Sequence, residues 1–157
     1  MIIRPATPAD STLIASFVRE LAEYENLAHD VDASEQMLAD ALFGPKPRVF
    51  CDIAEWDGAP AGFALWFYTF SSFRGLHGLW LEDLFVRAEF RGFGIGKALF
   101  SHLARRCVDE NLGRFEWSVL DWNEPSIAFY KGRGAKLLDE WTICRLSGAA
   151  LERLARE

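Results

Sequence analysis

The chain has 157 residues, 50% of them hydrophobic, and its 17 basic and 23 acidic side chains give a formal charge of −6. This size and composition fit one globular domain with a single core and exclude a disordered or fibrous chain. The acidic balance argues against nucleic-acid binding and favours small cationic ligands, because a phosphate backbone requires a basic surface. No apolar run reaches the roughly 20 residues that span a bilayer, and the amino terminus lacks a signal-peptide pattern. We therefore expect a cytoplasmic protein with no membrane partner.

Cysteine and histidine spacing points away from disulfides and metals. Cys51, Cys107 and Cys144 are odd in number and lie far apart in apolar surroundings. This pattern predicts buried thiols in a reducing compartment. The three histidines stand alone, without the spacing of a metal site, so we expect no structural metal.

Hydrophobic periodicity predicts an α+β domain that contains an antiparallel meander of three strands. The expected strands, in chain order, are 1–4, 49–54, 61–70, 79–87, 114–120, 136–138 and 141–146. The first helix is expected to begin after Thr7, with Pro8 in its first turn and Asp10 three residues beyond the cap. The other expected helices cover 34–42, 95–107, 123–131 and the tail from 149.

A glycine-rich segment, Arg91-Gly92-Phe93-Gly94-Ile95-Gly96-Lys97, lies between a predicted strand and a predicted helix. Such a turn lets the backbone approach a ligand, and the free amides of the helix start favour an anion such as a pyrophosphate. Lys97 stands where a dinucleotide-binding loop needs its third glycine. Arg91 and Ala98 break the pattern of an ATP-binding loop. Neither NAD nor ATP is therefore supported, and a glycine loop that only permits tight packing is the alternative.

The pattern Arg91-x-x-Gly94-x-Gly96 after a strand resembles the acetyl-CoA signature of the Gcn5-related N-acetyltransferases, the GNAT superfamily. More blocks resemble its diamine and polyamine branch, which includes the spermidine/spermine and thialysine acetyltransferases. These blocks are 1–7, 20–25, 81–86, 122–126 and 129–131. The resemblance extends to about Trp141. It implies one domain over 1–157 with the GNAT acyl-CoA N-acyltransferase fold, a mixed, mostly antiparallel sheet flanked by helices. It also implies a homodimer.

The resemblance implies that acetyl-CoA is the cofactor. The backbone of the strand end would pair with the pantetheine arm, the glycine loop would bind the pyrophosphate, and a later helix start would complete the site. The residues so assigned are Leu84, Phe85, Val86, Arg91, Gly92, Phe93, Gly94, Ile95, Gly96, Lys97, Asn123, Glu124, Pro125, Ser126 and Arg133. Lys97 and Arg133 supply cations for a polyanionic ligand, although Arg133 also suits a helix end.

Amine acetylation needs a base, because an alkylammonium is not nucleophilic, and it benefits from an acid at the departing thiolate. The resemblance implies Glu82 as the base, through a water, and Tyr130 as the acid. Tyr130 could instead be a packing residue. Asp83 could bond neighbouring backbone at a bulge, so we assign catalysis to Glu82 and Tyr130 alone. The cysteines fall outside these positions, which gives a covalent acetyl-cysteine route no support.

The resemblance places Tyr24, Glu25, Glu82, Asp83 and Glu140 on the amine side, although Glu25 could simply be solvated. The loop before the Glu82 strand, 69–75, lacks the aspartate of spermidine/spermine acetyltransferase and contains Arg74. This change disfavours spermidine and favours a lysine-like amino acid whose carboxylate Arg74 would meet. A peptide or protein amine remains an alternative, as does an acetyl-CoA-binding module without catalysis.

Overall fold

The computed structural model describes all 157 residues as two units, Met1–Ser118 and Val119–Glu157. The first unit holds β1 (Ile2–Pro5), α1 (Ser11–Tyr24), α2 (Glu35–Phe43), β2 (Phe50–Trp56), β3 (Ala59–Ser71), β4 (Leu76–Val86), α3 (Ile95–Asp109) and β5 (Phe115–Trp117). The second unit holds α4 (Glu124–Lys131) and α5 (Gly148–Leu154). No helix is long and apolar enough to cross a membrane.

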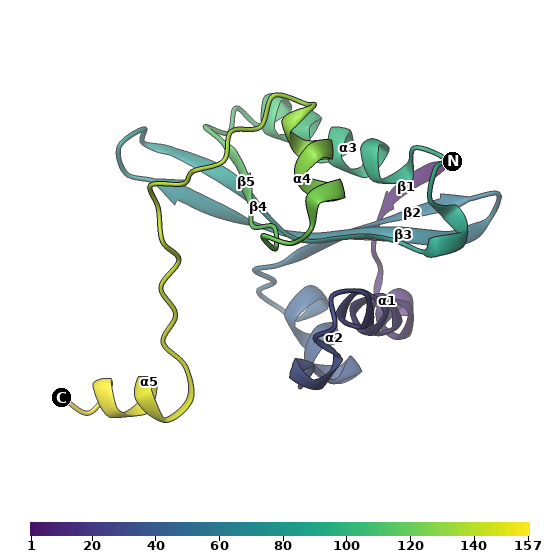
Figure 1. The fold of residues 1–157 in the computed structure, drawn as a ribbon. Helices are drawn as coiled ribbons and strands as arrows, with labels where there is room; N and C mark the ends of the chain where they lie inside the picture. The colour runs from purple at the N-terminus through teal and green to yellow at the C-terminus, as the bar shows by residue number, and fades with distance from the viewer. The chain divides into compact units, whose positions relative to one another are not determined.

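The five strands form one mixed sheet in the order β1-β2-β3-β4-β5. Neighbours are antiparallel except for β4 and β5, which are parallel and are joined by the α3 crossover. Helices α1 and α2 cover one face of the sheet and α3 covers the other (Figure 1). The predicted meander and the predicted α+β class are confirmed, and this arrangement puts the glycine-rich segment at the end of β4.

The main core lies between the sheet and the first two helices. Ile14 and Phe17 of α1 are fully buried in one cluster with Ile53, Phe63 and Phe85, which lie on β2, β3 and β4. The rings of Phe17 and Phe63 stack with their centroids 5.2 Å apart. Burying a side chain of this size stabilises the fold by about 2 kcal/mol. This core fixes α1 across the strands that carry the candidate site.

The opposite face is covered by α3, whose Leu99 and Leu103 are fully buried. Phe100 of α3 packs against Phe115 and Trp117 of β5, with ring centroids 4.8 and 4.9 Å apart. The four-residue spacing of the apolar side chains predicted this helix, and its buried face is the predicted one. It holds the glycine loop at one end of the sheet.

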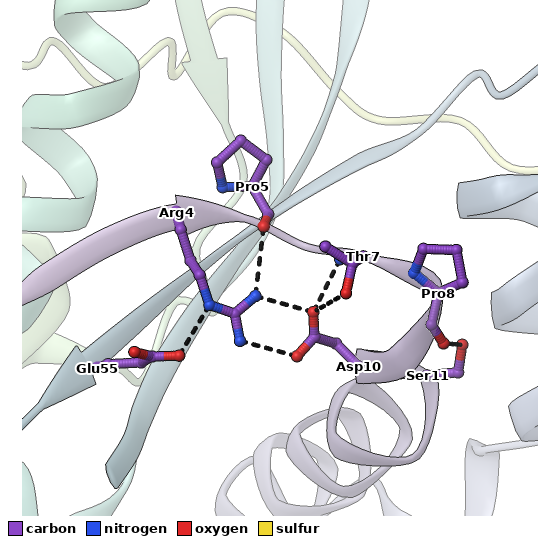
Figure 2. Close-up of polar contacts among 7 residues, drawn as sticks. All are labelled: Arg4, Pro5, Thr7, Pro8, Asp10, Ser11 and Glu55. Atoms are coloured by element: carbon purple, nitrogen blue, oxygen red, sulfur yellow. Dashed lines mark hydrogen bonds and ion pairs between the residues drawn. The ribbon is translucent and has the colours of Figure 1, made fainter. Parts of the chain in front are cut away.

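An ion-pair cluster ties the first strand to the first helix (Figure 2). The two terminal nitrogens of Arg4 donate to the two carboxylate oxygens of Asp10 at 2.8 Å, and its Nε donates to Glu55 at 2.7 Å. Asp10 also accepts from the backbone N–H and the hydroxyl of Thr7. Arg4 holds the pKa of Asp10 well below its usual range. The predicted helix start is thus confirmed, with Pro8–Asp10 as a 3-10 turn before α1.

Two expectations for the carboxyl-terminal part were wrong. Residues 135–147 contain no strand, so the strands predicted at 136–138 and 141–146 are absent. An alternating apolar pattern becomes a strand only where a neighbour supplies hydrogen bonds, and no strand of the chain pairs with this segment. Cys144 in this segment is exposed, whereas Cys51 and Cys107 are buried as predicted.

Candidate active site

A β-bulge in β4 lies at the centre of the candidate site. Leu81 faces Trp66 and Asp83 faces Leu65 across the β3–β4 pair, so Glu82 is the extra residue without a partner. The bulge disrupts the regular alternation of side chains between the two faces. Two consecutive acids within an apolar run indicate such an irregularity, and a bulge at Asp83 is the alternative to a catalytic role for that residue. The structure puts Glu82 itself at the bulge.

The pairing of β4 with β5 ends just before the bulge. β5 pairs with β4 only from Leu79 to Leu81, so residues 82–86 have a strand on one side only. The N–H of Arg87 donates to the carbonyl of Ala61 on β3. Along an antiparallel strand, the N–H and C=O groups of successive residues point alternately toward one neighbour and toward the other side. Leu84 and Val86 therefore point their backbone groups away from β3. This edge can accept an extended ligand arm as an added strand.

An arginine holds the end of α1 beside β4. Arg87, directly after β4, donates to the carboxylate of Glu20 at 2.7 and 2.9 Å, and its guanidinium lies 4.7 Å from the ring centroid of Phe17. Arg87 also donates to the carbonyl of Pro60. These contacts join α1, β3 and the end of β4.

The charges of two carboxylates act on a third at this place. Glu82 is exposed, and its Oε2 accepts a 2.8 Å hydrogen bond from the indole of Trp80. Burial, followed by the negative charges of Glu82 and Glu25, raises the pKa of Asp83 to about 7. Burial also raises the pKa of Glu25 above its ordinary value. An ammonium placed here would relieve this repulsion, so the acid cluster of Glu25, Glu82 and Asp83 suits a cationic amine.

The glycine loop has the backbone of an anion site. Gly92 and Gly94 adopt φ values of +86° and +80°, a region that side-chain-bearing residues rarely adopt. Gly94 caps α3 without a side-chain hydrogen bond, and the first helical bond runs from the N–H of Ala98 to the carbonyl of Gly94. The amides of the first turn of α3 have no helical acceptor. The residues present therefore fit a pyrophosphate.

Arg91, at the start of the loop, is held by three contacts. Its Nε donates to the carbonyl of Val86 at 3.0 Å. Its guanidinium lies 4.7 Å from the ring centroid of Tyr24 and 5.9 Å from that of Phe85. Tyr24 was assigned to the amine and Arg91 to the cofactor, so the structure brings together residues from the two predicted subsites.

The other loop residues lie in different surroundings. Phe93 is exposed and its ring packs 5.2 Å from that of Trp56. Ile95 is buried in the core, so only its backbone is free to meet a ligand. Gly96 adjoins Val86, and Lys97 lines an open groove of about 530 Å³ between β1 and α3.

The second unit carries the predicted cofactor residues at the start of α4. Asn123 is the N-cap, and its side chain accepts a 3.3 Å hydrogen bond from the N–H of Ser126. Glu124 and Pro125 form the first turn. This is the predicted helix start, and the cap explains why asparagine followed by proline occupies these positions.

The remaining predicted residues lie at and beyond the end of α4. Tyr130 is 8% exposed and its ring meets the edge of Phe129 at 5.3 Å. Arg133 donates to the carbonyl of Phe129 at 2.6 Å and lies 3.5 Å from the centroid of its ring. Arg133 thus has the helix-end contact that was the alternative to cofactor binding. Glu140 is exposed in a segment without regular structure.

Arg74 does not lie at the acid cluster. It is in the turn between β3 and β4, before Leu76 and close to Gly113. Six strand residues of about 3.3 Å each separate Leu76 from Glu82, which is roughly 20 Å. The amine and carboxylate of a lysine-like amino acid are roughly 8 Å apart at most. Arg74 therefore lies far along β4 from Glu82, and its contact with the carboxylate of a bound amino acid stays a prediction.

Comparisons with known proteins agree with this geometry. The model of the acetyltransferase (GNAT) family matches residues 14–135. A thialysine N-epsilon-acetyltransferase from Sus scrofa is 36% identical over 99% of this chain and 97% of its own length. An L-ornithine N5-acetyltransferase from Arabidopsis thaliana is 32% identical over 97% of this chain and 86% of its own. An integron cassette protein from V. cholerae superposes with a TM-score of 0.82 and 31% identity, over 99% of this chain and 98% of its own.

Proposed function

This chain belongs to the GNAT family of acetyltransferases, and we propose that it moves an acetyl group from acetyl-CoA directly to a primary amine of a small cationic molecule. The observation that carries the proposal is the acid cluster beside the one-sided end of β4. The acids attract an ammonium, and the strand edge beyond them is free to hold the acetyl donor. The amine and the acetyl group would then meet next to Glu82.

The amine must lose a proton before it attacks. Glu82 is exposed, and its carboxylate is oriented by the indole of Trp80, which leaves its other oxygen available to a water or to the amine. We assign it as the base that takes this proton. Asp83, with its pKa raised to about 7, and Glu25 hold the ammonium through charge. Tyr24 and Glu140 complete the amine side of the proposal.

Acetyl-CoA supplies a thioester whose carbonyl carbon accepts the amine nitrogen. The backbone of Leu84 and the N–H of Val86, whose carbonyl accepts from Arg91, would hold the extended arm, and the amides of the loop 92–97 would bind the pyrophosphate. The hydroxyl of Tyr130 would give a proton to the departing sulfur, which makes the thiol a better leaving group. Asn123 to Ser126 and Arg133 are assigned to the same ligand.

The relatives and the charge of the site favour different substrate classes. Two relatives are named as acetyltransferases of thialysine and of L-ornithine, which favours an amino acid with a side-chain amine. The acid cluster favours a second ammonium instead, and Arg74 lies at the far end of β4 from it. We therefore propose diamines or lysine-like amino acids as the candidates, and a matched pair of substrates separates them.

Thiol release from acetyl-CoA should be measured with lysine against cadaverine and with ornithine against putrescine. Each pair differs only by a carboxylate. A higher kcat/KM for cadaverine and putrescine supports diamines, and the reverse supports amino acids. A control without amine measures hydrolysis. If none of these amines, nor thialysine or spermidine, stimulates release while coenzyme A still binds, the proposed substrate class is wrong.

We also propose that the protein is a homodimer, as the family resemblance implies. Trp141, Ile143 and Leu146 are exposed within one short segment, which supports burial against a second copy. Light scattering after gel filtration measures the mass of the particle. A mass of one chain, about 17.8 kDa, at micromolar concentration contradicts the dimer.

A further inference from the structure

We propose that Tyr24 is a positioning residue for Arg91 and, through it, for the phosphates of coenzyme A. The inference rests on the proposed function, because it assumes that the loop 91–97 binds the cofactor. The resemblance places Tyr24 on the amine side only. The geometry adds a second role, since the ring lies against the first residue of the cofactor loop.

Arg91 is held from two elements at once. β4 supplies the carbonyl of Val86, which accepts from Nε at 3.0 Å, and the ring of Phe85 at 5.9 Å. α1 supplies the ring of Tyr24 at 4.7 Å, which is within the range of a cation–π contact. Without Tyr24, the guanidinium loses the closer of its two aromatic contacts and its contact with α1.

The orientation of Arg91 matters because an unrestrained arginine loses rotamer freedom when it binds a phosphate. The bond to Val86 uses Nε, so the two terminal nitrogens are not committed to it. A guanidinium fixed in this way presents a planar donor pair to an anion. Tyr24 therefore strengthens cofactor binding without touching the cofactor.

Because Tyr24 lies outside the core, its effect on cofactor binding can be measured separately from any effect on the stability of the fold. Its side chain is 40% exposed and lies outside the apolar core, so its removal opens no cavity between buried side chains. The adjacent Glu25 belongs to the acid cluster, and its charge acts on Asp83. The end of α1 thus carries one residue that contacts the cofactor loop and one that acts on the acid cluster. A loss of affinity for coenzyme A distinguishes the positioning role of Tyr24 from a role in amine binding.

The test is the dissociation constant of coenzyme A, measured by calorimetry on the full chain for wild type, Tyr24→Leu and Tyr24→Phe. We expect Tyr24→Leu to raise Kd about three- to ten-fold, the size of one cation–π contact. Tyr24→Phe keeps the ring face, so its Kd should stay within about two-fold of wild type. The KM for acetyl-CoA should follow Kd.

Phe73→Leu is the matched control, because it removes a fully exposed aromatic ring from the β3–β4 turn. Thermal melts of each variant confirm that the fold is intact. If Tyr24→Leu leaves Kd unchanged, even with a higher KM for the amine, the inference is wrong and Tyr24 acts on the amine alone. If wild type does not bind coenzyme A, both the inference and the proposed function are overturned.

Discussion

The indole of Trp80 donates a 2.8 Å hydrogen bond to the carboxylate of Glu82, two positions later in β4. The residue that follows, Asp83, is partly buried and lies opposite Leu65 on β3. Consecutive acids therefore have different surroundings, one oriented by an indole at the surface and one desolvated. Such pairs often divide the tasks of a reaction between them. We assign proton transfer to Glu82 and attraction of the ammonium to Asp83.

The pH profile of the reaction should report the ionisation of Asp83. Its pKa is raised to about 7, so the negative charge that attracts the amine forms as the pH passes about 7. We expect kcat/KM for the amine to rise over this range in wild type. Asp83→Asn should remove this rise and leave kcat/KM for the amine nearly constant between pH 6 and 9, where the free amine stays an ammonium.

Glu82→Gln should behave differently in the same experiment. Loss of a general base lowers kcat about 10²- to 10⁴-fold, while the rise near pH 7 remains. Initial rates between pH 6 and 9 at saturating acetyl-CoA measure both effects. A profile that keeps its rise near pH 7 in Asp83→Asn contradicts the assignment of Asp83.

The stability of the fold should also depend on Asp83. Its pKa is about 7 in the folded chain against an ordinary value of 3.8, so folding favours the protonated form. Stability therefore falls as the pH rises from about 4 to about 7, and the full penalty applies above that range. We expect Asp83→Asn to melt at a higher temperature than wild type at pH 8 and to differ little at pH 4. Calorimetric melting temperatures at the two pH values measure this, and equal melting temperatures at pH 8 argue against a desolvated Asp83.

Gly94→Ala should weaken cofactor binding. The φ of +80° at this position costs a side-chain-bearing residue about 1 kcal/mol or more, and the loop would relax away from the cofactor geometry. Gly58 in the β2–β3 turn has the same φ and the same open space around its Cβ position. Gly58→Ala is therefore the matched control. Both variants should lose similar stability, but only Gly94→Ala should show a higher Kd for coenzyme A. A similar Kd change in both variants would refute a local role for the loop.

Arg4→Gln should destabilise the first unit by about 1–3 kcal/mol, because it leaves the buried Asp10 without its two charged hydrogen bonds. Arg4 keeps the pKa of Asp10 well below its usual range. This stabilisation is therefore present above about pH 4 and is lost as the pH falls further. Urea unfolding at pH 7 and pH 3 should show a difference between variant and wild type that is full at pH 7 and smaller at pH 3, because pH 3 lies below the ordinary pKa of an aspartate but above that of Asp10 in the fold. Arg156→Gln, which breaks an exposed pair with Glu152, is the control and should change stability by less than about 0.5 kcal/mol.

Local patterns predicted the features that depend on neighbouring residues. The start of α1, the apolar face of α3 and the N-cap of α4 all follow from spacing within a few positions. The acid cluster depends on distant contacts. The charge of Glu25 on α1 acts on Asp83 in β4, Arg87 joins α1 to the end of β4, and the bulge depends on register with β3. The prediction of strands in residues 135–147 was wrong for the same reason, because a strand needs a neighbouring strand to pair with and the sequence of the segment does not show whether one is present.

Tyr130→Phe should lower kcat about ten-fold to one-hundred-fold while Kd for coenzyme A stays unchanged. The tyrosine is 8% exposed at the end of α4, and phenylalanine fills the same space, so the loss isolates the hydroxyl. The loss should shrink with an acetyl thioester of a nitrothiophenol, because a more acidic thiol leaves without a proton. Tyr68→Phe, which removes the hydroxyl that contacts Glu110, is the control and should keep wild-type turnover. Full turnover in Tyr130→Phe at saturating substrates would remove this residue from the mechanism and leave water as the source of the proton.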